Sequence, residues 1–282
     1  MSARNKDQRK GFQGRRGSMD DSRGLERRPG RPRGGRVIYV ACEGQKTEPE
    51  YLEYLTDTYG AGAADRPEFI LHRVPTRRGL RPDQTVAAVE REAAADEAWV
   101  LFDRDQHRES DIQQALRDAA EARVEVGFSH PSFELWFLLH FQAFSGAQHG
   151  SSDTVVDKLR NSRVTDAFRD YARHDKSVKS PARRNALRHR EQDAVDHARA
   201  LVNRCEHADC HADNAQWDLV PRAGDQARER ISWQRWSARS GHAEHCPVLG
   251  RDPSTDVWRL LVSLGIATVP DSPQRTRRRS IG

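Results

Sequence analysis

Three acidic residues follow two apolar runs that have the composition of buried β-strands. Glu43 comes directly after residues 37–42, and Asp103 and Asp105 come just after residues 98–102. In an open parallel sheet, ligands bind at the carboxyl ends of the strands, so these carboxylates meet at one edge if the two strands are neighbours. Carboxylates held close together repel one another unless a cation screens them, and hard divalent ions prefer oxygen ligands. The pattern therefore predicts a Mg²⁺ site, which Mn²⁺ could also fill, of the kind that supports phosphoryl transfer. The alternative is that the Asp-x-Asp pair is only a polar loop before the next helix.

Three more residues are candidates for the same chemistry. Gly44 permits a tight strand-to-helix turn that lets the Glu43 carboxylate face the sheet edge. Lys46 lies three residues from Glu43 and is a candidate for stabilising the charge of a phosphate in the transition state, unless it is a surface lysine at a helix start. Glu134 lies in the apolar stretch FELWFLLHF, where a buried carboxylate needs a cation, a metal or a helix N-terminus. We therefore assign Glu134 to catalysis, with helix capping as the alternative.

Other charged and polar residues have two interpretations each. Arg104 and Lys176 are predicted to bind the substrate, although a salt bridge would also explain Arg104. Glu48 is interpreted as a favourable charge in the first turn of a helix rather than as a metal ligand. His107 is interpreted as a solvated loop residue, with proton transfer as the alternative, and His140 as a core histidine.

Two short segments near the end of the chain are rich in cysteine and histidine. Residues 205–211 read CEHADCH and residues 242–246 read HAEHC. Zn²⁺ takes four nitrogen or sulfur ligands in structural sites, usually two from each of two segments. We name Cys205, Cys210, His242 and Cys246 as candidate ligands of a structural Zn²⁺, although the Cys-x₄-Cys spacing matches no common zinc finger. Chance enrichment in a His-rich chain is the alternative.

Alternating strand and helix patterns indicate an α/β fold with a mostly parallel sheet flanked by helices. Strands are predicted at residues 36–42, 68–74, 98–102 and 124–128, with helices starting near Pro49 and Pro82 and at residues 111–122 and 132–141. After residue 150 only helices are expected, at residues 153–160, 164–171, 181–205 and 254–264, the last capped by Ser254 or Asp252. The predicted organisation is a metal-binding core over residues 36–145 and a helical C-terminal subdomain over residues 146–270.

The chain's positive charge is concentrated at its two ends. Residues 1–35 contain eleven Lys and Arg against four acidic residues, and four arginines between residues 275 and 279 add further positive charge. Since the net charge of all 282 residues is only +5, the body between these ends is acidic. We expect a disordered basic arm over residues 1–35 and a basic tail over residues 271–282. Either could contact nucleic acid, or both could simply be solvated.

Several classes of protein do not fit this sequence. No apolar run reaches the roughly 18 residues that a membrane helix needs, and the charged N-terminus does not resemble a secretory signal. With four cysteines and no export signal, a disulfide framework is not expected. These features favour a cytoplasmic protein that does not contact membranes, and they leave open whether it forms a homo-oligomer.

Three blocks of the sequence resemble the RloB family. They are VACEGQKTEPEY at residues 40–51, WVLFDRDQH at residues 99–107 and SHPSFELWFLLHF at residues 129–141. The last block departs from the family in reading Ser-His-Pro-Ser where Ser-Asn-Pro-Cys is frequent. Together with weaker fragments, the resemblance covers about residues 36–265.

The resemblance implies a Toprim-like, metal-dependent nuclease encoded in prokaryotic defence islands. Glu43 would then match the general acid/base or metal-proximal glutamate, and Asp103 and Asp105 the metal-binding pair. The substrate would be RNA, including tRNA, or DNA, and an ATPase encoded nearby would be a partner in antiphage defence. The main alternative is a non-catalytic nucleic-acid-binding or assembly protein. Strand joining by a nucleophilic tyrosine fits less well, because Tyr51, Tyr54 and Tyr59 belong to a helix expected to face the core.

Overall fold

The computed structural model describes residues 35–77, 79–94, 96–104, 107–149, 151–171, 175–207, 209–211 and 232–269. The predicted basic tail, and the predicted basic arm apart from Gly35, lie outside these residues. No helix within these ranges combines the length and the apolar character needed to cross a membrane.

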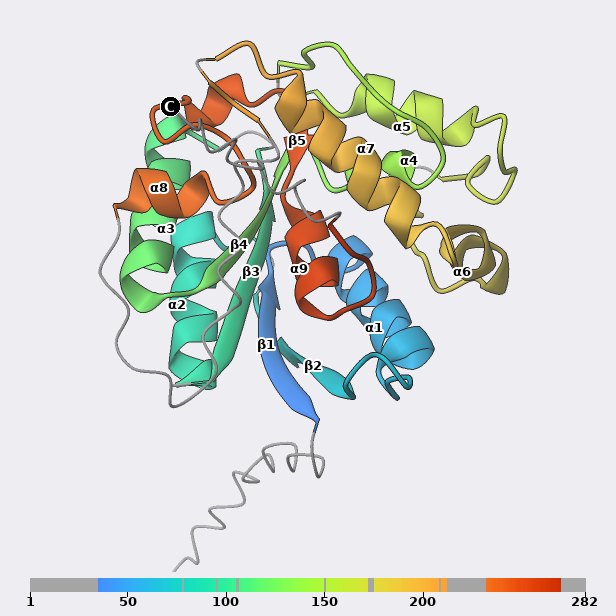
Figure 1. The fold of residues 1–282 in the computed structure, drawn as a ribbon, viewed down its shortest axis with the longest axis horizontal. Helices are drawn as coiled ribbons and strands as arrows, with labels where there is room; N and C mark the ends of the chain where they lie inside the picture. The colour runs from blue at the N-terminus through green and yellow to red at the C-terminus, as the bar shows by residue number, and fades with distance from the viewer. Residues whose placement is uncertain are drawn as a thin grey trace, which may run out of the picture. The chain divides into compact units, whose positions relative to one another are not determined.

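A five-stranded, mostly parallel sheet forms the centre of the fold (Figure 1). Its strands are β1 (Arg36–Cys42), β2 (Phe69–Val74), β3 (Glu97–Asp103), β4 (Glu125–His130) and β5 (Ser254–Thr255). The spatial order is β2-β1-β3-β4-β5. The first four strands are parallel, and β5 adds a short antiparallel pair beside β4. The α/β fold predicted from the sequence is therefore confirmed.

Helices cover both faces of the sheet (Figure 1). One face carries α2 (Pro82–Ala93) and α3 (Glu109–Ala122), with α8 (Trp233–Ser237) packed on α3. The other face carries α1 (Thr47–Tyr59), α4 (Glu134–Leu139) and α9 (Val257–Ser263). Three helices pack around α4 and beyond it: α5 (Asp153–Arg160), α6 (Pro181–Leu187) and α7 (Glu191–Asn203).

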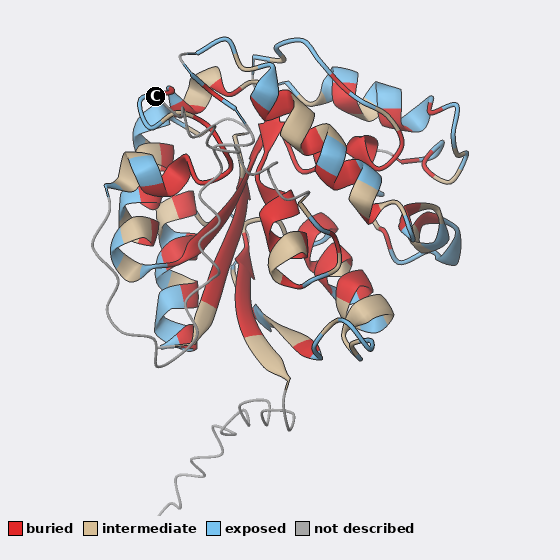
Figure 2. Cartoon of the chain, in the orientation of Figure 1, coloured by how far each residue is buried: buried red, intermediate tan, exposed pale blue. Residues whose placement is uncertain are grey.

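The apolar strands are buried on both faces, as their unbroken apolar composition predicts. In β1, Ile38 and Val40 belong to the core beneath α1 and α9, whereas Tyr39 and Ala41 belong to the core beneath α2 and α3. Figure 2 shows the central strands as buried along most of their length. This two-sided packing fixes the register of β1 against β3, because a slip by one residue would exchange the two faces.

The order of the strands creates a topological switch point between β1 and β3. The chain leaves β1 toward β2 on one side of the sheet and returns to β3 on the other side of β1. The connections diverge there, so the carboxyl ends of β1 and β3 flank the crevice in which doubly wound α/β proteins place their ligands.

A buried cluster of charges ties α9 and the segment after α8 to the sheet. Glu125, the first residue of β4, is fully buried. Its carboxylate accepts hydrogen bonds from Arg239 at 2.5 Å and from Arg259 at 2.6 Å. These contacts neutralise a carboxylate that could not be buried alone.

The described part of the chain departs from its predicted helices in three places. Residues 164–171 form turns rather than a helix, because the Ser162 and Thr165 hydroxyls accept the backbone N–H groups two residues later. The helix predicted over residues 181–205 is divided into α6 and α7, since the chain leaves helical geometry at Arg188 and His189 has a positive φ of 66°. The helix predicted over residues 132–141 is shorter, as α4.

The predicted start of the last helix is also wrong. Residues 254–255 form β5, a strand whose two-residue length gives no periodic signal. The N-cap of α9 is Asp256, and its side chain makes no capping hydrogen bond. Asp252 instead accepts hydrogen bonds from the Gln148 and His149 backbone N–H groups, at 2.8 and 2.6 Å.

Candidate active site

Glu43 and Asp103 lie at neighbouring strand ends beside the switch point. The Glu43 backbone N–H donates to the Leu101 carbonyl at 3.0 Å, which continues the pairing of β1 with β3 by one residue. Asp103 is the last residue of β3. Burial is the largest cause that raises the pKa of Asp103, and the nearby charge of Glu43 adds to it. Asp105 lies outside the described residues.

His107 holds one oxygen of the Glu43 carboxylate. Its Nε2 lies 2.5 Å from Glu43 Oε1, and both side chains are mostly buried. An ionised carboxylate can only accept, so His107 Nε2 is the donor in this contact whenever Glu43 is ionised. The other oxygen, Oε2, is buried and has no hydrogen-bonding partner among the described residues. An unpaired buried carboxylate oxygen is costly, and a cation would satisfy it.

Glu48, in the first turn of α1, is folded back over the strand-to-helix turn. It is only 5% exposed. A Cβ atom built on Gly44 would come within 2.1 Å of Glu48 Oε2, so the carboxylate occupies the space that any larger residue at position 44 would need. Burial raises the pKa of Glu48 to about 7, and repulsion from Glu134 and Glu43 contributes to the shift. Glu48 therefore lies in the first turn of a helix, as interpreted from the sequence, and the structure adds that its side chain is buried.

Asp103 has the same electrostatic character as Glu48. Desolvation raises the pKa of the Asp103 carboxyl well above its usual range, and repulsion from Glu48, Glu134 and Glu43 raises it further. A hydrogen bond from the Phe133 backbone acts in the opposite direction. Burial and the charges of neighbouring carboxylates thus make the ionisation of both Asp103 and Glu48 less favourable.

Glu134, the first residue of α4, is 2% exposed and paired. Lys176 Nζ lies 2.6 Å from Glu134 Oε1, and the Tyr171 hydroxyl donates to the same oxygen at 3.2 Å. Burial alone would raise the pKa of Glu134, but the charge of Lys176 and its hydrogen bond hold that pKa below its usual value. Glu134 therefore carries a negative charge in the site.

Contacts with α1 position Lys176. The Glu50 carboxylate accepts hydrogen bonds from the Ser177 hydroxyl at 2.6 Å and from the Val178 backbone N–H at 2.8 Å. Burial lowers the pKa of the Lys176 ammonium, but Glu134, Asp103 and Glu48 together outweigh it and raise the pKa overall. Lys176 thus partly neutralises the acidic cluster from the helical half of the chain.

The remaining predicted site residues lie at the rim. Lys46, in the turn between β1 and α1, is exposed, and its Nζ lies 3.5 Å from Asp175 Oδ1. Arg104 directly follows β3, and its guanidinium donates to the His107 carbonyl. That contact helps to fix the loop that carries His107. The predicted roles of Lys46, Arg104 and Lys176 toward a substrate stay predictions.

The donor atoms at this edge are suited to a hard divalent cation. They are carboxylate oxygens in a region of mutual repulsion, and one of them is buried without a partner in the described part of the chain. Among the described residues, however, the side chains already spaced to hold an ion are Cys205, Cys210, His242 and Cys246 rather than these carboxylates. The predicted Mg²⁺ site at the strand ends therefore stays a prediction.

Three residues of the site were missed or given other roles from sequence. Tyr171 carried no signal, because its partner Glu134 lies 37 positions away along the chain. The sequence favours a solvated loop position for His107, yet its side chain contacts Glu43. The third residue is Glu48, whose carboxylate is folded over the turn. Gly44, four residues earlier, is the sequence signal for this, because only a glycine leaves room for that carboxylate.

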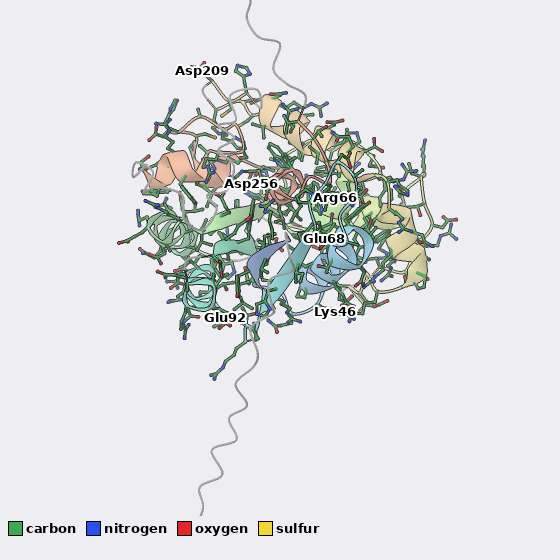
Figure 3. The ribbon with its side chains drawn as sticks, turned by 60° about the horizontal axis from the view of Figure 1, so that its bottom comes forward. Lys46, Arg66, Glu68, Glu92, Asp209 and Asp256 are labelled. Atoms are coloured by element: carbon green, nitrogen blue, oxygen red, sulfur yellow. The ribbon has the colours of Figure 1, made fainter. Side chains whose placement is uncertain are left out.

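The four candidate zinc ligands form a separate group. Figure 3 shows Lys46, at the rim of the acidic site, and Asp209, between two of the cysteines, on opposite sides of the view. The two groups therefore do not share ligands.

The strand order and the acidic switch point together define a doubly wound α/β protein. The family model of RloB-like proteins matches residues 38–264, so the chain belongs to the RloB-like family. No curated protein and no solved structure matches it.

Proposed function

We propose that this chain is a metal-dependent phosphodiesterase that cleaves nucleic acid. The observation that carries the proposal is the desolvated cluster of Glu43, Glu48, Asp103 and Glu134 beside the switch point. A divalent cation would turn their mutual repulsion into attraction and would satisfy Glu43 Oε2, which no described residue hydrogen-bonds. Resemblance to Toprim-like nucleases supports the same chemistry.

In this proposal, Glu43, Asp103 and Asp105 would hold Mg²⁺ or Mn²⁺. Such an ion supplies an activated water and stabilises the charge of the leaving oxygen. The contact between His107 and Glu43 orients the carboxylate and leaves its second oxygen available. Lys176 keeps Glu134 ionised and limits the build-up of negative charge.

The surroundings of the site suit an anionic polymer. Exposed basic residues lie at or near the carboxyl ends of β1, β2 and β3, namely Lys46, Arg73, Arg77 and Arg108. A hydrogen bond from Gln45 to Thr76, at 2.9 Å, joins the β2–α2 loop to the turn after β1. Basic side chains around an acidic metal site are expected to bind the flanking phosphates.

The biological setting is part of the proposal and rests on family membership. We propose that the chain is an effector of antiphage defence and that an ATPase encoded nearby controls it. RNA, with tRNA as one candidate, is proposed as the substrate beside DNA.

A cleavage assay tests the enzymatic part. The wild-type chain is incubated with tRNA, total RNA and plasmid DNA in Mg²⁺, in Mn²⁺ and in chelator. We expect cleavage of at least one substrate in metal only, and a loss of about 100-fold or more in Glu43→Gln and in Asp103→Asn. Glu92→Gln is the matched control, because Glu92 is an exposed residue of α2.

Two outcomes would overturn the proposal. Cleavage that persists in both substituted chains would show that these carboxylates do not carry the chemistry. Metal-independent binding of nucleic acid without cleavage would instead support a non-catalytic binding or assembly protein.

A further inference from the structure

A second group of metal-ligating side chains lies outside the acidic site. Cys205 and Cys210 follow α7, and His242 and Cys246 lie between α8 and the 3₁₀ turn η2 (Val248–Gly250). One ligand atom from each of the four residues lies within 4.8 Å of the others. The chain segments that carry them are far apart in sequence, so folding brings the set together.

The distances within the group suit tetrahedral coordination. Cys205 Sγ lies 3.7 Å from Cys246 Sγ, and Cys246 Sγ lies 3.8 Å from His242 Nδ1. With Zn–S near 2.3 Å and Zn–N near 2.0 Å, the edges of a tetrahedron are about 3.8 Å between sulfurs and about 3.6 Å from sulfur to nitrogen. A disulfide would need about 2.05 Å, so the two cysteines are not bonded to each other.

The group is also desolvated. Cys210, Cys246 and His242 are each at most 6% exposed, and Cys205 is half-buried. The Ala243 backbone N–H donates to Cys210 Sγ at 3.1 Å, a contact that stabilises a metal-bound thiolate. Burying these polar groups is unfavourable unless something coordinates them.

We propose that Cys205, Cys210, His242 and Cys246 bind one structural Zn²⁺. Four protein ligands complete the coordination shell and leave no position for water or substrate, which distinguishes this site from a catalytic one. The inference is independent of the proposed nuclease activity, since no residue is shared with the acidic site.

The ion would join the end of α7 to the segment that leads into β5. Five residues after Cys246, Arg251 is buried and donates to the Ser237 and Cys246 carbonyls at 2.7 and 3.1 Å. Asp252 then anchors the backbone of residues 148 and 149. The zinc therefore fixes both ends of the segment from residue 211 to residue 241. It also stabilises the position of the segment that leads into β5, which pairs with β4.

Metal analysis of the full chain tests the proposal without any activity measurement. The chain purified without added metal is expected to contain one zinc per molecule. Replacement with Co²⁺ is expected to give the intense visible and charge-transfer bands of tetrahedral thiolate coordination. Chelation is expected to lower the melting temperature, and Zn²⁺ to restore it.

Substitutions identify the ligands. His242→Ala and Cys246→Ser are expected to lose the zinc, whereas His245→Ala and Cys42→Ala are expected to keep it. His245 is an exposed neighbour of His242, and Cys42 is the remaining cysteine, in β1. If a ligand variant does not fold, the wild-type metal content and Co²⁺ spectrum still decide the question. A folded wild-type chain that neither contains Zn²⁺ nor takes up Co²⁺ would overturn the proposal, as would undiminished zinc in folded Cys246→Ser.

Discussion

The ion pair between Lys176 and Glu134 is expected to stabilise the packing of the helical half of the chain against the sheet edge, and its contribution to the free energy of unfolding can be measured. Lys176→Met keeps most of the aliphatic stem and removes the charge, which leaves the Glu134 carboxylate buried beside the Tyr171 hydroxyl without its cationic partner. Losing one partner of a fully buried ion pair costs about 3–5 kcal/mol. Because the Lys176 side chain is 37% exposed, water screens part of this loss, and we expect a destabilisation of about 2 kcal/mol.

A double-mutant cycle isolates the interaction. The free energy of unfolding is measured by urea denaturation in the presence of chelator for wild type, Lys176→Met, Glu134→Gln and the double variant. We expect a coupling energy of about 1–2 kcal/mol, because the double variant no longer buries an unpaired charge. Lys179→Met is the matched control. Lys179 is 55% exposed and pairs with Glu53 at the surface, so its loss should cost less than about 1 kcal/mol. Additive single effects, or a control as costly as Lys176→Met, would refute the reasoning.

Three further predictions concern single positions. Gly44→Ala places a Cβ within 2.1 Å of Glu48 Oε2, so the carboxylate must move. We expect the free energy of unfolding to fall by about 1 kcal/mol and cleavage to fall tenfold or more. Unchanged cleavage would contradict the placement of Glu48. Burial lowers the pKa of His140 to about 4, so the folded chain resists a proton that the unfolded chain accepts near pH 6.5. Stability should therefore fall by about 1.3 kcal/mol from pH 7.5 to pH 5.5, and the wild-type minus His140→Asn difference in urea denaturation should show this slope. Glu125→Gln leaves two buried guanidinium groups without their counter-charge, so it should lower the free energy of unfolding by about 3 kcal/mol or more. A decrease below about 1 kcal/mol would contradict this prediction.

The sequence predicts the sheet well because its strands carry their own signal. The apolar runs of β1 and β3 are buried on both faces, so nearly every residue in them is apolar. The sequence assigns Glu43 and Asp103 to one edge on the condition that their strands are neighbours, and the parallel pairing of β1 with β3 meets that condition.

Properties that depend on partners distant in sequence could not be predicted. The buried state of Glu48 depends on its approach to Gly44, and the pairing of Glu134 depends on a lysine 42 positions later in the chain. Similarly, β5 exists only because residues 254–255 lie against the end of β4. The failed helix at residues 164–171 has a local cause, since the hydroxyls of Ser162 and Thr165 compete for backbone donors.

The zinc ligands illustrate an intermediate case. Residue types alone selected Cys205, Cys210, His242 and Cys246 from among several neighbouring histidines, and the structure brings these four together. The spacing of the four residues could not confirm the choice, since Cys205 and Cys210 are separated from His242 and Cys246 by a long segment and the spacing matches no common zinc finger.

The most direct test of the central claim is to locate a bound Mn²⁺ by anomalous diffraction from crystals grown or soaked with that ion. The account predicts an anomalous peak at the carboxyl ends of β1 and β3, within bonding distance of the Glu43 and Asp103 carboxylates, that disappears in Asp103→Asn. Crystals that contain Mn²⁺ at other sites, or none, while Glu43 and Asp103 stay without an ion at a saturating concentration, would contradict it.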